Sequence, residues 1–403
     1  MFSQPEPLLR EIERSFPDRP FSIELWDGRR LPATEDNGGP VFRVRSPRAV
    51  AHALRAPGQL GVGRAYVAGD LDPDDLDAVM RLLDEWNPPP LEGRAKARLG
   101  LAALRAIGLM RPPPIPAAEL RPRGERHTRE RDRRAVRHHY DVSNEFFALF
   151  LDRSMTYSCA IFSRGAETLE EAQRTKLDLV CTKLRLREGE RVLDIGSGWG
   201  SFAIHAAREY GARVLGITLS EPQARLAREL AAEAGVGDRV EFRVADYREL
   251  PEGDFDAIAS IGMVEHVGEA QIDRYASRLA ELLRPGGRLL NHGIARLRHT
   301  DPDAGPFSER YVFPDAEPLH LSRVMAAIER AGFEPGRTEA FRSDYAETLR
   351  HWAERLDAKR ARAEQLAGPE RLRVWRLYLR AARNGFLTGF TSIFQVEATK
   401  PGG

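Results

Sequence analysis

Cysteine is almost missing from this chain of 403 residues, in which Cys159 and Cys181 are the only two. This scarcity excludes a disulfide-stapled secreted scaffold and a cysteine-based zinc site. Long apolar runs are missing as well, since no stretch approaches the about eighteen uncharged residues of a membrane span. The first residues, MFSQPEPLLREIERSF, lack the basic and apolar regions of a secretory signal. We therefore expect a protein of the reducing cytoplasm that meets any lipid from the aqueous side.

A surplus of one charge is missing too. The 61 basic residues are balanced by 60 acidic ones, which gives a formal net charge of +1. This balance excludes nucleic-acid or membrane attraction by bulk electrostatics, so any such attraction must be local. With 42% hydrophobic and 30% charged residues, 403 residues suffice for one large core and a second, smaller one.

The hydrophobic pattern predicts two domains and a linker. Residues 1–108 hold short strands followed by helices, which indicates a small α+β domain. Residues 109–134 are a linker rich in proline and arginine. In the second domain, 135–403, strands alternate with helices to about residue 340, which predicts an α/β fold with a parallel sheet covered on both faces. The predicted N-terminal elements are strands at 21–25 and 41–44 and helices at 49–54 and 76–86.

The arginines of the linker allow two interpretations, which stay open. One is a surface that approaches anionic head groups, where each arginine contributes on the order of 1 kcal/mol. The other is a solvated connector, because Glu125, Glu130 and Asp132 dilute the charge. The arginines are Arg121, Arg123, Arg126, Arg129, Arg131, Arg133 and Arg134.

A glycine-rich turn is the most informative segment of the second domain. An apolar strand at 191–195 ends in the sequence DIGSGWG (194–200), and a helix at 201–210 follows directly. Glycines let such a turn adopt backbone angles that other residues resist, and they bring a ligand against the main chain. The alternative is a tight turn from strand to helix that binds nothing.

The spacing of the glycines favours one class of cofactor. A dinucleotide-binding turn needs its third glycine at the position of Ser201, whereas Gly196, Gly198 and Gly200 have the Gly-x-Gly-x-Gly spacing. This spacing favours S-adenosylmethionine over a nicotinamide cofactor. Asp194, at the end of the strand, is then placed near the methionine ammonium group.

The following strands deliver polar residues to the same edge of the sheet. Thr218, Ser220 and Gln223 stand where the ribose hydroxyls need partners, and the last two have the spacing of a capping box that begins a helix. Asp246 and Tyr247 are placed to hydrogen bond to adenine and to stack on it. The strands are predicted at 213–217, 240–244 and 255–260.

Near the C-terminus, apolar residues recur at helical spacing between residues 345 and 386, which predicts two helices that cover the core. A final strand at 389–398 is predicted to complete the edge of the sheet. Cys181, on a predicted helix that starts at Leu169, is expected in the core.

Five motifs occur in order along the second domain: YSCA (157–160), DIGSGWG (194–200), GITLS (216–220), EHVG (265–268) and HGI (292–294). Together they resemble those of the cyclopropane-fatty-acyl-phospholipid synthases and the related mycolic-acid cyclopropane and methyl-branching enzymes. The segment GVGRAYVAGD (61–70) is similar to the lipid-contacting N-terminal domain of the phospholipid-acting branch. Ser197 departs from the pattern, because many relatives carry cysteine there.

The resemblance implies a Rossmann-like class I methyltransferase fold, with a mostly parallel seven-stranded sheet and a helical lid, after a small α+β lipid-contacting domain. It places Tyr140, Tyr157 and Ser158 around the methionine end of the cofactor and the turn glycines along its middle. It also implies a bicarbonate ion beside the methyl group, and no metal. The implied bicarbonate ligands are Cys159, Glu265, His292, the main chain of Ile294, and Tyr345.

The implied activity is transfer of the methyl group of S-adenosylmethionine to the double bond of an unsaturated fatty acyl chain of a phospholipid. The step passes through a carbocation and needs a dry, apolar pocket. Bicarbonate is the candidate general base, and Glu265 takes its proton. A proton lost from the new methyl closes a cyclopropane, whereas a hydride shift first gives a methylene branch, and the sequence does not choose between them.

The expected partner is the inner face of the membrane, bound peripherally, and not nucleic acid. A reductase that saturates a methylene product and a homodimer stay open. Two other functions also stay open. A small-molecule O- or N-methyltransferase on the same fold would use Glu265 or His292 as base, and a lipid-binding protein would keep the fold without catalysis. For Cys159, the plain alternative is a small core residue.

Overall fold

The computed structural model describes residues 5–35, 39–120, 128, 131, 143–251, 253–299 and 305–402. The chain forms two compact units. Unit 1 comprises Met1–Arg121, Gly305–Val312 and Ala367–Ala381, and unit 2 comprises Pro122–Ala304, Phe313–Leu366 and Ala382–Gly403. Within the described ranges, no helix has both the length and the apolar character that a membrane span requires.

Unit 1 is an α+β unit, as predicted. Its elements are α1 (Glu6–Ser15), β1 (Ser22–Glu24), β2 (Arg30–Leu31), β3 (Val41–Val44), α2 (Arg48–Arg55), α3 (Gln59–Val67), β4 (Leu71–Pro73), α4 (Leu76–Glu85) and α5 (Gly93–Ile107). The four strands form one sheet in the order β2-β1-β3-β4. Leu8 of α1 packs with Ala103 and Ala106 of α5, because small side chains let the two helices approach closely.

Two segments from later in the chain, Gly305–Val312 and Ala367–Ala381, also belong to unit 1. The short helix α12 (Pro306–Tyr311) contributes Phe307, whose ring fills the space that a Cβ on Gly63 would need. Glu119 accepts two hydrogen bonds of 2.6 Å from the Arg64 guanidinium and one of 3.0 Å from the Tyr311 hydroxyl. These contacts join positions far apart in the sequence. The predicted domain boundaries at 108 and 134 stay predictions.

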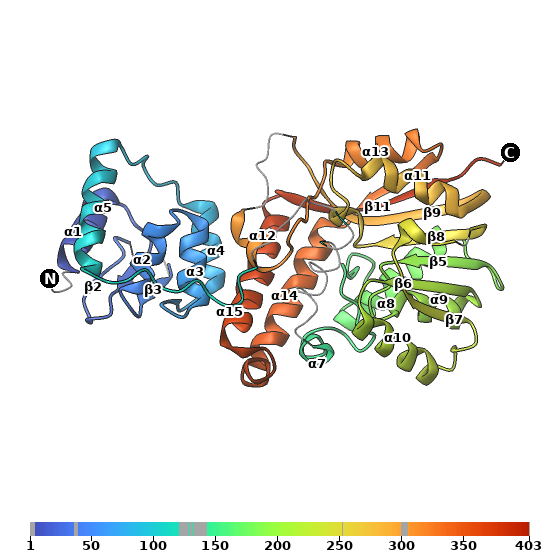
Figure 1. Cartoon of the computed structure of the whole chain (residues 1–403), viewed down its shortest axis with the longest axis horizontal. Coiled ribbons are helices and arrows are strands. Elements are labelled where there is room, and N and C mark those ends of the chain that lie inside the picture. The colour runs from blue at the N-terminus through green and yellow to red at the C-terminus, as the bar shows by residue number, and fades with distance from the viewer. Residues whose placement is uncertain are drawn as a thin grey trace. The chain divides into compact units, whose positions relative to one another are not determined.

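Unit 2 is built on a seven-stranded sheet in the order β10-β11-β9-β8-β5-β6-β7 (Figure 1). β11 pairs antiparallel with both of its neighbours, and the other pairs are parallel. This is the predicted mostly parallel sheet of seven strands. The strands are β5 (Arg191–Ile195), β6 (Arg213–Thr218), β7 (Val240–Val244), β8 (Phe255–Ile261), β9 (Leu283–Arg296), β10 (Glu334–Ala340) and β11 (Thr391–Thr399).

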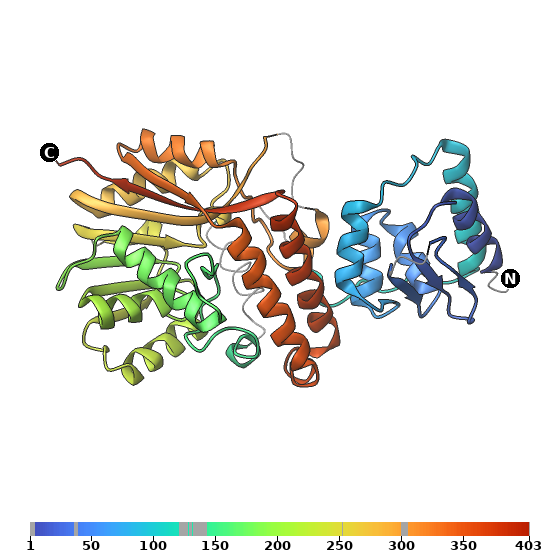
Figure 2. The ribbon, with the colours of Figure 1, turned by 180° about the vertical axis from the view of Figure 1, so that it is seen from behind.

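The prediction that the last strand forms the edge of the sheet is wrong. β11 lies between β9 and β10, and β10 is the edge strand (Figure 2). Because β11 is covered on both sides by hydrogen-bonded neighbours, its residues from Ser392 to Val396 are buried. The sequence analysis did not predict β10, because this strand is polar and almost wholly exposed and so has no alternation of apolar residues.

Helices cover both faces of this sheet (Figure 1). Alternate residues of β5 show why: Leu193 and Ile195 join the core that includes α11 and α13, whereas Val192 joins the core that includes α8, α9 and α10. Cys181 lies in this second core, as predicted. The helices are α7 (Asn144–Phe147), α8 (Leu169–Lys183), α9 (Ser201–Tyr210), α10 (Glu221–Glu233), α11 (Ile272–Leu282) and α13 (Leu321–Arg330). Two 3₁₀ turns, η1 (Tyr247–Glu249) and η2 (Val264–His266), follow β7 and β8.

The two predicted C-terminal helices are α14 (Arg342–Ala358) and α15 (Arg360–Leu387). α15 is broken at Gly368, which has a φ of 77°, and Pro369 follows it. Proline removes a helical hydrogen bond, and glycine accepts the left-handed conformation, so the chain turns there. The lid role of these helices stays a prediction.

Candidate functional site

A pocket of about 190 Å³ lies at the carboxyl ends of β5, β6 and β8, where the strand order of the sheet reverses. This is the position at which doubly wound sheets bind ligands. Most of the predicted cofactor residues line it, namely Tyr157, Ser158, Asp194, Gly196, Gly198, Thr218, Gln223, Asp246 and Tyr247.

The glycine turn wraps one side of the pocket. Gly196, Gly198 and Gly200 have φ angles of 77°, 54° and 86°, which side chains resist. A Cβ on Gly196 would lie 2.7 Å from Met263, and one on Gly200 would lie 2.4 Å from Phe242. Both the backbone angles of the turn and its close packing against Met263 and Phe242 therefore require glycine. The turn feeds directly into α9 at Ser201, so the amide groups at the start of the helix lie at the pocket.

The Asp194 carboxylate accepts a hydrogen bond from the Ala203 amide, but one of its oxygens has no partner. It is buried, and its Oδ2 accepts no hydrogen bond. Burial raises the pKa of Asp194 to about 7, although the Lys176 ammonium lowers it in part. An orphaned carboxylate oxygen at a pocket wall suits an ammonium group. The methionine end of S-adenosylmethionine provides one, so these residues fit that cofactor.

The predicted ribose contacts are partly engaged with one another. The Thr218 hydroxyl donates to Oε1 of Gln223 at 2.8 Å, and Ser220 accepts from the Gln223 amide at 3.4 Å. The capping box predicted from the Ser-x-x-Gln spacing is therefore only half formed, because the Gln223 side chain turns to Thr218. Thr218 and Gln223 line the pocket, and Ser220 caps α10 behind it.

The predicted adenine contacts follow β7, the strand that pairs with β6. Asp246 caps η1 through the Arg248 amide, and it holds the Arg248 guanidinium at 2.6 Å. Tyr247 packs edge-on against Tyr275, with ring centroids 5.6 Å apart. The Asp246 carboxylate is thus shared with an arginine that also lines the pocket.

At the predicted methionine end, Tyr157 stacks on Trp352, with ring centroids 5.1 Å apart. The Ser158 hydroxyl accepts from the Lys176 ammonium at 3.1 Å. Tyr140, the third residue predicted there, lies outside the described residues.

The predicted bicarbonate ligands fall into two groups, of which the first lies at the ends of β8 and β9. Glu265 is buried on η2, and its Oε2, which has no partner, lies 3.2 Å from the place of a Cβ on Gly293. Gly293 stands between His292 and Ile294 on β9. Burial raises the pKa of Glu265 to about 7, although the Glu265 and Ile294 amides lower it in part. Burial lowers the pKa of His292 to about 3, so its ring is neutral at physiological pH.

The second group is Cys159 and Tyr345. Sγ of Cys159 lies 3.8 Å from the carbonyl oxygen of Phe341, and the same carbonyl accepts from the Tyr345 amide at 3.0 Å. Burial raises the pKa of the Cys159 thiol well above its usual range, so the thiol stays protonated. The Lys176 charge acts on both groups, because it lowers the pKa of Cys159 and of His292.

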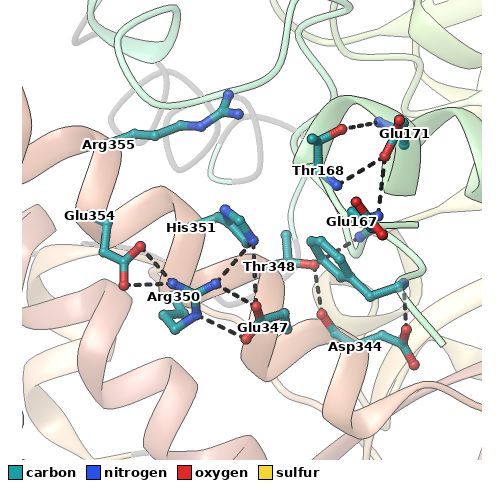
Figure 3. Close-up of polar contacts among 12 residues, drawn as sticks. Glu167, Thr168, Glu171, Asp344, Glu347, Thr348, Arg350, His351, Glu354 and Arg355 are labelled. Carbon is teal, nitrogen blue, oxygen red and sulfur yellow. Dashed lines mark hydrogen bonds and ion pairs between the residues drawn. The ribbon is translucent and has the colours of Figure 1, made fainter. Parts of the chain in front are cut away.

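Sequence analysis missed several residues that support these groups. Thr348 accepts from the Ala160 amide at 3.0 Å, and Asp344 accepts from the Phe162 and Ser163 amides at 2.7 Å. Figure 3 shows these two side chains on α14 beside the start of α8. They fix the backbone on the C-terminal side of Cys159. In the sequence, Asp344 and Thr348 are polar residues one helical turn apart on the face of α14 that is buried, and this pattern could have identified them.

The family model described as mycolic acid cyclopropane synthetase matches residues 127–396. A relative from Pseudomonas putida, named "Probable fatty acid methyltransferase", is 36% identical over 408 residues, which cover 100% of this chain and 96% of the relative. The chain belongs to the mycolic acid cyclopropane synthetase family. The resemblance seen in the five motifs is thus confirmed.

Further comparisons agree with this family assignment. The "Cyclopropane-fatty-acyl-phospholipid synthase" of Escherichia coli (strain K12) is 32% identical over 356 residues, or 88% of this chain and 86% of the relative. The solved structure of mycolic acid cyclopropane synthase CmaA1, complexed with SAH and CTAB, is 32% identical and aligns with a TM-score of 0.63 over 66% of this chain and 98% of that one. This member of the family is therefore an S-adenosylmethionine-dependent methyltransferase of the class I fold.

Proposed function

We propose that this enzyme transfers the methyl group of S-adenosylmethionine to the double bond of an unsaturated fatty acyl chain in a phospholipid. The step passes through a carbocation and yields a cyclopropane or a methylene- or methyl-branched chain. The observation that carries the proposal is the buried Glu265 carboxylate, whose Oε2 has no partner, at the end of the sheet that also forms the cofactor pocket. The names of the P. putida and E. coli relatives support a fatty acyl substrate.

The bound cofactor supplies an electrophilic sulfonium methyl group. The protein holds the cofactor with Asp194 on the methionine ammonium and with Thr218 and Gln223 on the ribose, while the glycine turn lines its middle. Tyr157 and Ser158 close the methionine end. An alkene is a weak nucleophile, so this positioning is the main contribution of the protein to the rate.

The deprotonation step needs a base shielded from water, because water would convert the carbocation to an alcohol. We propose a bicarbonate ion held by Cys159, Glu265, His292, the Ile294 amide and Tyr345. A carboxylate whose pKa lies near 7 accepts and releases a proton readily at neutral pH, so Glu265 can take the proton of the bicarbonate. The neutral His292 ring and the protonated Cys159 thiol are hydrogen-bond donors suited to an anion.

The phospholipid requires the enzyme to work at a membrane surface. We propose that it binds the inner face of the membrane peripherally, through the N-terminal domain 1–108 and the linker arginines between 121 and 134. Arg131 is excepted, because it is buried and paired with Asp315. A reductase would follow if the product is a methylene branch, and a homodimer is compatible with the proposal.

Incubation with dioleoyl phospholipid vesicles and methyl-labelled S-adenosylmethionine tests this function. The label should appear on the acyl chain, with a mass gain of one CH₂, and NMR of the lipid should show a cyclopropane or a branch. Glu265→Gln should abolish transfer without loss of S-adenosylhomocysteine binding. Label found only on an oxygen or nitrogen acceptor would reject the proposal in favour of a heteroatom methyltransferase.

A further inference from the structure

A buried lysine at the cofactor pocket has no role in the site described so far. Lys176 lies on α8, is only 1% exposed, and lines the pocket beside Ser158 and Asp194. Its ammonium forms one hydrogen bond, to the Ser158 hydroxyl at 3.1 Å, and no ion pair within the described part of the chain. A buried cation without a bonded carboxylate is costly to keep, so a function for its charge is expected.

α8 fixes Lys176 against the segment that precedes Cys159. The helix begins in a full capping box between Thr168 and Glu171 (Figure 3). One turn before Lys176, the Gln173 side chain donates to the Ser158 carbonyl at 2.9 Å and to the Thr156 carbonyl at 3.3 Å. The helix thus holds Ser158 by both its backbone and its side chain, and the hydroxyl cannot move independently of the lysine.

Lys176 and Asp194 place opposite charges at one pocket. Each affects the pKa of the other, yet no ion pair joins them in the described structure. The amino acid end of S-adenosylmethionine is a zwitterion, with an ammonium and a carboxylate on one carbon. The Asp194 carboxylate suits the ammonium, which leaves the carboxylate of the cofactor in need of a positive partner.

We propose that Lys176 is the positioning residue for that carboxylate and acts through Ser158. Because the lysine donates to the oxygen of Ser158, the hydroxyl proton is left to donate to the carboxylate of the cofactor. The ammonium charge behind the serine stabilises the same carboxylate. Two opposite charges then fix both polar groups of the methionine, and with them the direction of the sulfonium methyl.

The other groups around Lys176 are consistent with this role. Asp152, Cys159, Asp194 and Cys181 are the titratable groups that raise the pKa of Lys176, and burial, the larger effect, lowers it to about 8. Asp152 is occupied by the Ser154 and Thr156 amides at 2.9 Å, and the two thiols are protonated. The ammonium therefore stays available for an anion that enters the pocket.

Direct binding measurements without lipid test the proposal. It rests on the cofactor of the proposed function but not on its methyl acceptor, so it can succeed where the lipid assay fails. We would titrate S-adenosylhomocysteine, its decarboxylated analogue and 5′-methylthioadenosine into the full chain by calorimetry. For the wild-type protein, loss of the carboxylate should weaken binding at least about tenfold, as expected for a charge-assisted hydrogen bond.

Lys176→Met should weaken S-adenosylhomocysteine binding by the same factor and leave the affinity for the two ligands without a carboxylate unchanged. Lys183→Met is the matched control, because Lys183 lies on the same helix but pairs with Glu339 at 2.8 Å outside the pocket. It should change none of the affinities. Ser158→Ala should show the same selective loss, and the double variant should lose less than the sum of the two.

Equal weakening of all three ligands by Lys176→Met would overturn the proposal, since it would indicate a role in packing only. If Lys176→Met does not fold, the proposal is tested by two other results: the ligand affinities of Ser158→Ala, and the difference in wild-type affinity between ligands with and without a carboxylate. A wild-type protein that binds the decarboxylated analogue as tightly as S-adenosylhomocysteine would also overturn it.

Discussion

The side-chain nitrogen of Gln395 lies 2.9 Å from Nδ1 of His292. The two residues face each other in the register of β11 and β9, and both are fully buried. Since the Gln395 amide nitrogen donates, Nδ1 of His292 accepts, and the ring proton of the neutral imidazole is on Nε2. That nitrogen is buried without a partner. The Nε2–H group of His292 can therefore donate a hydrogen bond to a bound anion.

Gln395→Glu should reverse this tautomer. A carboxylate at position 395 accepts from Nδ1–H, which turns Nε2 into an acceptor that repels an anion. We expect kcat to fall about a hundredfold, with S-adenosylhomocysteine affinity unchanged because Gln395 lies outside the cofactor pocket. Nitrogen NMR of the histidine ring reports the tautomer, and Gln365→Glu on the exposed surface of α15 is the control. Full activity with a reversed tautomer would contradict the assigned role of His292.

Glu265→Gln should stabilise the protein at alkaline pH while it removes activity. The pKa of Glu265 is about 7 in the folded protein against 4.5 for an unburied glutamate. The folded state therefore binds more protons than the unfolded state between these values, and stability falls as pH rises from 4.5 through 7. In the variant, no carboxyl group has to be ionised in the folded protein. Its free energy of unfolding should therefore exceed that of the wild type by on the order of 3 kcal/mol at pH 8, and the difference should vanish near pH 4.5.

Urea unfolding at pH 8 and pH 5 measures this difference. Glu233→Gln, exposed on α10, should show no such pH-dependent gain. A Glu265→Gln variant that is less stable than the wild type at pH 8 would show that hydrogen bonds from the surroundings outweigh the cost of burying the carboxylate, contrary to the prediction.

The affinity for S-adenosylhomocysteine should fall in acid. Burial raises the pKa of Asp194 to about 7, and only the ionised carboxylate attracts the ammonium group of the ligand. Below pH 7 we expect the affinity to decrease by up to about tenfold per pH unit. Asp194→Asn should bind weakly and without this acid dependence. Calorimetry from pH 5.5 to 8 tests it, and a flat wild-type profile would argue against Asp194 as the ammonium partner.

Two glycines of the turn should differ in their tolerance of a methyl group. Gly200→Ala places a Cβ 2.4 Å from Phe242 at a φ of 86°, so overpacking adds to backbone strain, and we expect a loss of about 3 kcal/mol. Gly198→Ala meets nothing within 4 Å and should lose only about 1 kcal/mol. Chemical denaturation compares them. Gly165→Ala, also at positive φ in open space, is the control for strain alone, and equal losses at 198 and 200 would contradict the packing argument.

The sequence by itself determined the cofactor turn and the strands that surround it. Gly196 to Gly200 follow an apolar strand and precede a helix, and neighbours in the chain decide such a turn, so its geometry can be predicted locally. The placement of Thr218, Asp246 and Glu265 at one edge also follows from the sequence, because parallel strands present their carboxyl ends together.

Only the tertiary structure decided the partners of these residues. Lys176 is a charged residue on a helix, which in a sequence resembles any surface lysine, and its burial depends on how α8 packs on the sheet. Gln395 meets His292 only through the register of β11 on β9, and β10 became the edge strand without an apolar pattern of its own. Such contacts join positions far apart in the chain, and their energies arise from packing and desolvation, which local sequence patterns do not encode.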